Sequence, residues 1–317
     1  MGTPMTTKPS LDTPIVHVLL ATYNGAEWLD EQLDSILGQT GVAVRVFVLD
    51  DMSTDGTLEV LARRAAADPR VVMLPPQGSS GGAAPNFYRM LRAVEVPDHA
   101  YLSFADQDDI WYLDKLSRHV GILREGAYDA VSSSVRAFTP DGKRTLIRKN
   151  YPQRKYDYLT ESPGPGSTFV LTARLARLVV DQLNDPESPA SRADFHDSIV
   201  YAIGRGRGWA WHIDGKPSLD YRQHGRNVMG SNTGIDPALA RLRLIRDHWH
   251  RGQAIIHART ALRVAPPADR DGLERMLTLL EGRGIRNSWA LARRGRQMRR
   301  RPRDQSIIAV LIAIGVW

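Results

Sequence analysis

The sequence predicts an α/β fold built on a mainly parallel, twisted sheet flanked by helices. Short apolar runs rich in β-branched residues alternate with segments in which apolar residues recur at helical spacing. This alternation is typical of parallel strands joined by right-handed helical crossovers. Hydrophobic residues make up 42% and charged residues 24% of the 317-residue chain, as in an ordinary globular protein with a sizeable core.

The first half of the chain carries the clearest alternation. Strands are predicted over 15–21, 44–49, 71–74 and 100–105. Helices are predicted between them, over 26–37, 57–67 and 86–96, the last after a Gly/Ser/Ala/Pro loop at 75–85. Ligands of parallel sheets bind at the carboxyl ends of the strands, so the polar segments that follow three of these strands should share one rim.

The second half is less regular. The elements predicted there are a strand over 129–138, a turn over 161–167 followed by a short strand, helices over 173–183 and 194–203, and two short strands on either side of Asp214 and Gly215. Beyond Gly234 the pattern is helical and rich in arginine. We therefore divide the chain into a leader (1–13), an α/β domain (14–234) and a helical, Arg-rich extension with an apolar tail (235–317).

Composition excludes several classes of protein. The chain has no cysteine, which excludes disulfides, thiolate zinc sites and a cysteine nucleophile. It has no run of eighteen apolar residues, and its first residues lack the apolar stretch of a secretory signal. We therefore expect a cytoplasmic protein without a transmembrane helix.

Three carboxylates follow the strand at 100–105. Asp106, Asp108 and Asp109 are separated only by Gln107. Such carboxylates repel one another unless a cation neutralises them, and oxygen ligands without Cys or a nearby His suit Mg²⁺ or Mn²⁺. The alternative is a solvated Asp-rich turn that caps the next helix.

Polar segments also follow the first two strands. Thr22, Tyr23 and Asn24 offer backbone groups and an aromatic face, whereas Asp50 and Asp51 can accept hydrogen bonds from a nucleobase or a ribose. The residues at 53–55 are expected to cap the helix that starts at Thr57.

Taken in order, these three segments resemble the family 2 glycosyltransferases of the GT-A fold, and most closely the bacterial rhamnosyltransferases among them. The resemblance covers about residues 15–235. It implies that the first two loops, with Thr22, Tyr23, Asn24 and Asp51, hold the donor nucleotide, with Asp50 as an alternative to Asp51. It further implies that Asp106 contacts ribose or metal and that Asp108 binds a divalent metal, Mg²⁺ or Mn²⁺.

Two downstream segments extend the resemblance. The segment DFHDSIV (194–200) matches the family motif whose aspartate is the catalytic base, which maps to Asp197. Without the resemblance, a helix cap or an Arg partner would be the simpler interpretation of Asp197. The segment at 220–230 implies that Arg222 and His224 contact the diphosphate, or that His224 completes the metal shell. Residues 164–172 resemble the segment that lines the acceptor side.

Two positions depart from the family pattern. Met52 stands where the family usually has glycine, which predicts a negative φ if the loop is unstrained. The loop at 77–87 contains no Arg or Lys, which leaves it without an evident phosphate contact.

The predicted function is that of an inverting, metal-dependent glycosyltransferase. By resemblance it transfers rhamnose from dTDP-rhamnose to a hydroxyl of a glycan or lipid-linked acceptor in cell-surface polysaccharide synthesis. A UDP-sugar donor, and so a UDP-hexose transferase, is the alternative. A nucleotidyltransferase is disfavoured because it would need a Gly/Arg-rich phosphate loop after the first strand, and the segment TYNG at 22–25 is not such a loop. Nucleic-acid binding is disfavoured because the basic residues lie outside the α/β core and lack interleaved aromatic residues.

The C-terminal end combines charge with an apolar run. Seven arginines lie within 293–303, next to IIAVLIAIGVW at 307–317. Eleven residues are too few to cross a bilayer, which needs about twenty. A basic cluster beside a Trp-tipped apolar segment predicts peripheral association with an anionic membrane surface. The alternative is that this tail folds back on the catalytic domain.

Overall fold

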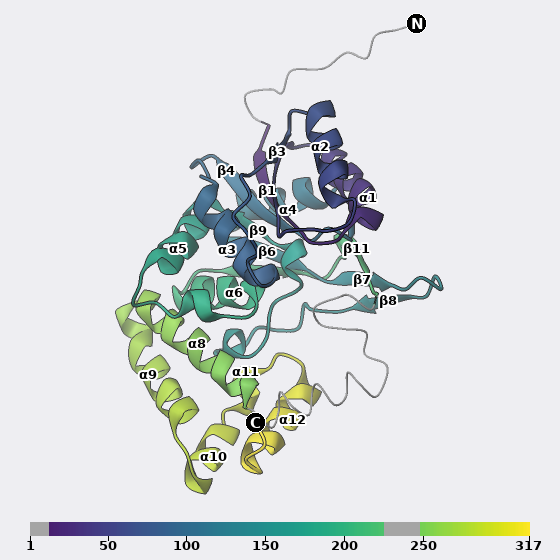
Figure 1. Cartoon of the computed structure of the whole chain (residues 1–317). Helices are drawn as coiled ribbons and strands as arrows, with labels where there is room; N and C mark the ends of the chain where they lie inside the picture. Colours follow the sequence, from purple (N-terminus) through teal and green to yellow (C-terminus); the bar gives the residue numbers. More distant parts are fainter. Residues whose placement is uncertain (1–12, 225–247) are drawn as a thin grey trace, which may run out of the picture.

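The computed structural model describes residues 13–224 and 248–317, in which a sheet-based body is followed by a helical C-terminal part (Figure 1). The strands are β1 (Ile15–Thr22), β2 (Ala43–Asp50), β3 (Val71–Met73), β4 (Ala100–Ala105), β5 (Ile110–Trp111), β6 (Ala130–Ser133), β7 (Val135–Phe138), β8 (Arg144–Ile147), β9 (Val170–Thr172), β10 (Trp211–Asp214) and β11 (Leu219–Arg222). The helices of the body are α1 (Ala26–Leu37), α2 (Thr57–Ala67), α3 (Ala83–Ala93), α4 (Lys115–Glu125), α5 (Ala173–Asn184) and α6 (His196–Gly206), with 3₁₀ turns η1 (Asp157–Leu159), η2 (Gly166–Thr168) and η3 (Ala190–Arg192). The C-terminal helices are α8 (Trp249–Val264), α9 (Pro267–Glu281), α10 (Ile285–Ala292), α11 (Gly295–Met298) and α12 (Pro302–Ala313).

The main sheet has seven strands in the order β10-β6-β9-β4-β1-β2-β3. It is mainly parallel, because only β9 runs antiparallel to its neighbours β4 and β6. The central strand β1 pairs with β2 on one side and β4 on the other, with Thr22 opposite Asp50 and Leu20 opposite Ala105. This register brings the carboxyl ends of the three strands to one rim, as the sequence predicts.

The apolar run of β1 is continuous because both faces of the strand are covered. Val16, Val18 and Leu20 belong to a core shared with α1 and α4, whereas Leu19 belongs to a core shared with α3, α5 and α6. A strand buried on both sides has no need for the polar alternation of a half-exposed strand.

Several predicted elements differ from the structure. The single strand expected over 129–138 is two strands, β6 in the main sheet and β7 in a second sheet ordered β5-β11-β7-β8. The change occurs at Ser134, whose N–H donates to the carbonyl of Asp214 at 2.9 Å and so turns the chain between the sheets. Helix α3 begins at Ala83 rather than near residue 86. The boundary predicted near Gly234, and nearly all of the leader at 1–13, lie outside the described residues.

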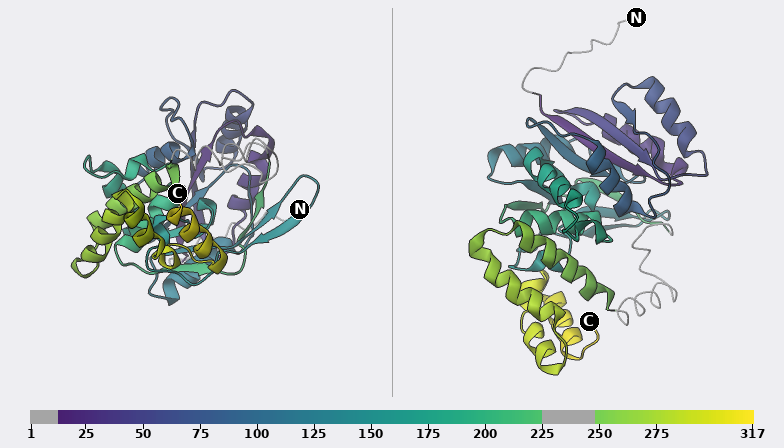
Figure 2. Two further views of the ribbon diagram at one scale, coloured as in Figure 1. Left: turned by 90° about the horizontal axis from the view of Figure 1, so that it is seen from below. Right: turned by 60° about the vertical axis from the view of Figure 1, so that its left-hand side comes forward.

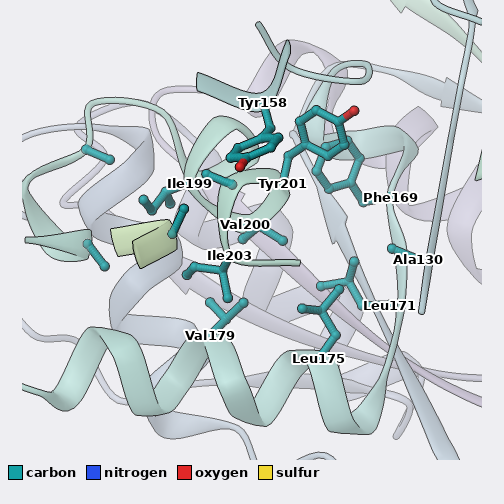
Figure 3. Close-up of a cluster of buried hydrophobic side chains, with 14 of the residues drawn as sticks. Ala130, Tyr158, Phe169, Leu171, Leu175, Val179, Ile199, Val200, Tyr201 and Ile203 are labelled. Atoms are coloured by element: carbon teal, nitrogen blue, oxygen red, sulfur yellow. The ribbon is translucent and has the colours of Figure 1, made fainter. Parts of the chain in front are cut away.

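Helix α6 is anchored in the larger core. Figure 3 shows Ile199, Val200 and Ile203 of α6 facing Leu175 and Val179 of α5. The aromatic residues Tyr158, Phe169 and Tyr201 close the cluster on the other side. The start of α6 therefore has a fixed position relative to the sheet.

The C-terminal helices extend the same core (Figure 2). Helix α8 packs on α6, α9 packs on α8, and α12 packs on α10 and α11. Ile308, Ile312 and Trp317 are buried, so part of the apolar tail folds back on the protein. Within 13–224 and 248–317, every helix is too short or too polar to cross a lipid bilayer.

Candidate active site

The loops that follow β1 and β2 are joined by side-chain hydrogen bonds. The Thr22 hydroxyl donates to Asp50 Oδ1 at 2.9 Å. Ser53 donates to the same carboxylate, from its N–H at 2.8 Å and from its hydroxyl at 2.6 Å. Asn24 donates its N–H to Ser53 Oγ and accepts the N–H of Thr54, each at 2.8 Å. Asp50 therefore has a structural role here, which favours its neighbour Asp51 as the nucleotide contact.

Asp55, rather than Ser53 or Thr54, supports the helix that starts at Thr57. Its carboxylate accepts the N–H of Thr57 at 3.0 Å and that of Ala26 at 3.2 Å. These N–H groups open α2 and α1, where such donors lack partners within the helix. One carboxylate therefore fixes both helices at the rim.

Asp51 is buried and faces the loop before α3. It accepts hydrogen bonds from Ser80, through the backbone N–H and, at 2.8 Å, through the hydroxyl. Arg89 of α3 reaches back over this loop and donates to the carbonyls of Gly78 at 2.7 Å and Ser79 at 3.0 Å, with its guanidinium 4.0 Å from Asp51. Sequence reasoning missed this cation because it lies in the following helix and not in the loop.

Tyr23 links the first loop to the acidic segment. Its N–H donates to Gln107 Oε1 at 2.7 Å, and Gln107 Nε2 donates to the Tyr23 carbonyl at 2.9 Å. The approach is close, because a Cβ at Gly25 would lie 2.2 Å from Gln107 Oε1. The Tyr23 side chain is 57% exposed, so its ring offers a free face at the rim.

Met52 has a left-handed backbone, with φ of +67°, so the expectation of a negative φ is wrong. The conformation follows from the hydrogen bonds that Ser53 donates to the carboxylate of Asp50, which close a tight turn around Met52. A left-handed conformation costs a non-glycine residue about 1–2 kcal/mol. The turn therefore tolerates the Met52 side chain, which is 54% exposed, although glycine would adopt this backbone conformation at lower cost.

The acidic segment after β4 forms a cluster with Asp197. Burial, together with the charges of Asp108 and Asp197, raises the pKa of Asp106 to about 7. Burial and the charges of Asp108 and Asp106 also raise the pKa of Asp109 well above its usual value. Carboxylates from two distant parts of the sequence therefore lie within electrostatic reach, with more negative charge than the nearby cations balance.

Asp109 is bonded into the protein interior. Its Oδ2 accepts the Ser167 hydroxyl at 2.7 Å, and the buried Lys115 Nζ donates to the Ser167 carbonyl at 2.6 Å. Burial lowers the pKa of Lys115, while the charges of Asp109 and Asp106 oppose that shift. Sequence reasoning missed Lys115, because a lysine is rarely buried in a folded protein and nothing local marks this one. Asp109 therefore belongs to the support of the site, and Asp106 and Asp108 are the carboxylates left for a ligand.

Arg222 and His224 both contact Asp108. His224 Nε2 lies 2.7 Å from Asp108 Oδ2, and its ring stacks on Trp28 with centroids 4.1 Å apart. Arg222 Nε donates to the Asp108 carbonyl at 2.9 Å, and its guanidinium pairs with Glu31. The imidazole thus meets the carboxylate, whereas the guanidinium holds the backbone. This geometry favours His224 over Arg222 as a ligand that complements Asp108.

The donor set at this position fits a hard divalent cation. The Asp108 carboxylate and the His224 imidazole meet at 2.7 Å, and the charge of Asp108 acts on the neighbouring Asp106. Among the residues that the structure describes, no group of three or more His, Asp or Glu side chains is placed so that it could hold a metal ion. An incomplete set is what Mg²⁺ or Mn²⁺ commonly uses, since the remaining ligands come from substrate phosphates and water.

Asp197 lies in the first turn of α6. Its carboxylate accepts the N–H of Ser198 at 2.6 Å. Burial raises its pKa, while hydrogen bonding from Ser162 and Ser198 and the charge of Lys149 oppose the rise. The preceding His196 is buried and packs on Phe87, with ring centroids 4.0 Å apart.

The segment predicted on the acceptor side, 164–172, lies against the start of α6. A Cβ at Gly166 would lie 2.2 Å from His196 Nε2, so the backbone of this segment approaches α6 as closely as glycine allows. Glycine at this position therefore permits the contact between the two segments.

The sequence is similar to those of known glycosyltransferases. The glycosyl transferase family 2 model matches residues 17–178. A dTDP-rhamnosyl transferase of Shigella flexneri, RfbG, is 33% identical over 299 residues, which covers 94% of this chain and all of that protein.

Solved structures share the fold. Residues 1–349 of S. aureus TarS in complex with UDP-GlcNAc align with a TM-score of 0.58 and 16% identity, over 95% of this chain and 81% of that one. The mannosyltransferase PcManGT of Pyrobaculum calidifontis, solved with GDP-Man and Mn²⁺, aligns with a TM-score of 0.51 and 20% identity, over 99% of this chain and 80% of that one. The fold is therefore the GT-A fold, and the chain belongs to glycosyl transferase family 2.

Proposed function

We propose that this glycosyltransferase moves rhamnose from dTDP-L-rhamnose to a hydroxyl of a glycan acceptor, with inversion at the anomeric carbon. The observation that carries the reaction type is that the start of α6, which bears Asp197, packs on the end of β4, which leads to Asp106. The rings of His196 and Phe104 lie 5.1 Å apart there, and the charge of Asp197 raises the pKa of Asp106. This packing joins a donor-side carboxylate and a second carboxylate suited to act as a base. The choice of donor rests on the whole-length likeness to the Shigella flexneri dTDP-rhamnosyl transferase.

The nucleotide would occupy the rim formed by the first two loops. The exposed ring of Tyr23 offers a stacking face for the base, and the backbone groups of Thr22 and Asn24 border the same loop. Asp51 would exchange its bonds to Ser80 for a bond to the base. Arg89 lies close enough to Asp51 to interact with a bound phosphate.

Asp106, Asp108 and His224 would hold the divalent cation, Mg²⁺ or Mn²⁺. Such an ion offsets the negative charge that builds up on a leaving diphosphate. The protein contributes the positions of these ligands: Arg222 fixes the Asp108 backbone, and Trp28 fixes the His224 ring.

Asp197 would act as the base. Its carboxylate takes the proton of the acceptor hydroxyl as that oxygen attacks the anomeric carbon, and the bond from this carbon to the diphosphate oxygen breaks. A single displacement from the opposite face inverts the configuration. The pKa of Asp197 is raised by burial, which brings it closer to the pH at which general-base catalysis is efficient.

The acceptor is proposed to be a lipid-linked glycan at the inner face of the membrane, which the enzyme approaches through its C-terminal helices. Ile285 and Trp289 lie one turn apart on α10. Ile307 and Val310 lie on α12 at helical spacing, and Ile314 directly follows the end of that helix; all five are exposed. This membrane patch, as we call these five residues, lies on two helices that pack together.

Arginines accompany the membrane patch. Between residues 283 and 303 the exposed arginines are Arg283, Arg286, Arg293, Arg294, Arg296, Arg301 and Arg303. Apolar side chains that enter the headgroup region, together with arginines that attract anionic lipids at about 1 kcal/mol each, suit an interfacial contact. The anchor proposed here is thus a folded surface and not the whole tail, because Ile308, Ile312 and Trp317 are buried.

A donor screen tests the function. The melting temperature would be measured with dTDP-L-rhamnose, dTDP, UDP-GlcNAc and UDP, each with and without Mn²⁺, since a ligand stabilises the fold it binds. We expect the largest shift with dTDP-L-rhamnose and Mn²⁺, and slow release of dTDP by transfer to water. A larger shift with the UDP compounds would replace the proposed donor by a UDP-sugar.

A further inference from the structure

The last residues of α11 and the two residues that follow it, 297–300, lie along residues 156–162 of the catalytic domain. The N–H of Tyr156 donates to the Gln297 carbonyl at 2.8 Å, and the Thr160 hydroxyl donates to the Met298 carbonyl. The N–H of Arg300 donates to Glu161 Oε1 at 2.5 Å. The C-terminal part is therefore bonded to the segment that precedes the acceptor-side residues at 164–172.

The side chain of Arg300 continues this contact into the interior, where only 2% of it is exposed. Its Nη2 donates to the Ser162 carbonyl at 2.5 Å. Its Nη1 lies 3.3 Å from Asp157 Oδ2 and 3.5 Å from the Tyr201 hydroxyl. One guanidinium therefore ties Ser162 to helix α6, which carries Tyr201.

Ser162 and Tyr201, the two partners of Arg300, both lie near Asp197. The Ser162 hydroxyl donates to the Gly164 carbonyl at 2.5 Å, and it lies close enough to the Asp197 carboxylate to oppose the rise in the pKa of Asp197. Tyr201 lies one helical turn beyond Asp197 on α6. Arg300 thus holds the two elements between which the Asp197 carboxylate sits.

We propose that Arg300 is a positioning residue for the transfer reaction: by holding the Ser162 backbone and Tyr201, it fixes the Asp197 carboxylate toward the acceptor. The proposal rests on the assignment of Asp197 as the base. It makes the C-terminal part a component of the active site, in addition to any role at a membrane.

Charge balance alone does not explain Arg300. Arg205 of α6 already lies 3.2 Å from Asp157 Oδ1, so Asp157 keeps a cationic partner without Arg300. Arg205 does not replace the contacts of Arg300 with the Ser162 carbonyl and with Glu161, whose Oε1 lies 3.6 Å from Arg300 Nε. Glu161 keeps a second cation, Arg299, at 3.9 Å, so the Ser162 contact is the one that depends on Arg300. A guanidinium can serve Ser162, Asp157 and Tyr201 together because its donors form a rigid fork, which the single ammonium group of lysine lacks.

The test compares Arg300→Met and Arg300→Lys with the control Arg275→Met, which removes an exposed arginine of α9. For the full-length protein with Mn²⁺, the dissociation constant for dTDP-L-rhamnose and the rate of dTDP release at saturating donor would be measured. We expect the rate to fall by about 10- to 100-fold in Arg300→Met, since small misplacements of a catalytic group have effects of this size. Donor affinity should stay within about twofold, Arg300→Lys should recover part of the rate, and Arg275→Met should match the wild type.

Ser162→Ala and Asp197→Asn complete the design. If Arg300 acts through Ser162, Ser162→Ala should lower the rate, and the double variant with Arg300→Met should lose less than the product of the two single effects. If Arg300→Met does not fold, the test uses Arg300→Lys and Ser162→Ala, each of which should release dTDP more slowly than the wild type. If the Arg300 and Ser162 variants keep the wild-type rate while Asp197→Asn is inactive, the proposal for Arg300 is wrong but the assignment of Asp197 as the base stands. A wild-type rate in Asp197→Asn would overturn the base assignment, and the proposal with it.

Discussion

His224 Nε2 lies 2.7 Å from Asp108 Oδ2, across 116 positions of the sequence. The contact joins the segment after β11 to the acidic segment after β4, and the stacked ring of Trp28 from α1 fixes the orientation of the imidazole. Three separate parts of the chain therefore meet at one carboxylate. Arg222, two residues before His224, secures the backbone of the same aspartate.

Asp108→Ala should abolish sugar transfer and metal-dependent donor binding but leave the fold intact. Removal of one carboxylate relieves repulsion within a cluster where the pKa of Asp106 is already raised, so the metal-free protein should not become less stable. Donor hydrolysis with and without Mn²⁺, together with the melting temperature, checks this expectation. Transfer at the wild-type rate in the variant, or full activity of the native enzyme in a chelator, would refute the metal assignment.

Asp106 should make the metal-free protein less stable as the pH rises. The pKa of Asp106 is about 7 in the folded protein and has an ordinary value of 3.8. The folded state therefore binds the proton more tightly, so stability falls as pH increases from about 4 to about 7 and levels off above that. Asp106→Asn lacks this titration.

The measurement is the difference in melting temperature between Asp106→Asn and the wild type, taken at several pH values. The difference should grow in favour of the variant between pH 4 and 7 without metal. Saturating Mn²⁺ at pH 8 should stabilise the wild type and narrow the difference. A difference that stays constant with pH would show that Asp106 is not perturbed.

Asp197→Asn should retain donor affinity and lose turnover. The amide keeps the shape of the side chain but cannot accept a proton, and general-base catalysis contributes about 10²–10⁴-fold. Calorimetric binding of dTDP-L-rhamnose and the rate of transfer separate the two effects. Weakened donor binding with normal turnover would instead assign Asp197 a structural role. The anomeric configuration of the product, read by NMR, tests inversion independently.

Charge introduced into the membrane patch should release the protein from anionic vesicles. The variant combines Trp289→Glu with Val310→Glu, whose parent side chains are 54% and 58% exposed. The control is Leu146→Glu on β8, an apolar residue of similar exposure, 57%, in the catalytic domain. Co-sedimentation should fall several-fold for the patch variant only. Equal sedimentation of the wild type with neutral and anionic vesicles would show that the arginines do not contribute to binding. Unchanged binding of the patch variant would show that the protein contacts the membrane through another surface.

Met52→Gly should stabilise the protein. Glycine adopts the φ of +67° without steric cost, while it loses more conformational entropy on folding than methionine. The net gain in the free energy of unfolding should be about 0.5–1 kcal/mol. Met52→Ala, which keeps a Cβ, is the control and should show no gain. Chemical denaturation measures all three proteins, and a destabilised glycine variant would mean that the Met52 side chain makes a favourable contact.

Local sequence was enough to predict most elements and the rim itself. Helices α1 and α2 begin and end where the apolar periodicity predicts, and β1, β2 and β4 coincide with short apolar runs. These signals are local because a strand buried on both faces needs an unbroken apolar run, and a helix needs an apolar stripe. Polar residues at the ends of such strands are placed together by the parallel sheet alone, which is why the segments after these three strands were expected to share one rim.

Long-range contacts decided the rest. No local pattern indicates that Ser134 turns the chain from one sheet to another, since its N–H bonds to Asp214, 80 residues away. The basic tail was predicted as a single surface element, yet Arg300 is buried beside Asp157 whereas Arg301 is exposed. The sequence determines which residues carry charge, but only packing determines which charges find a buried partner. A guanidinium can leave water only where fixed acceptors replace its hydration, and the acceptors of Arg300, Asp157 and the Ser162 carbonyl, come from a part of the chain about 140 residues earlier.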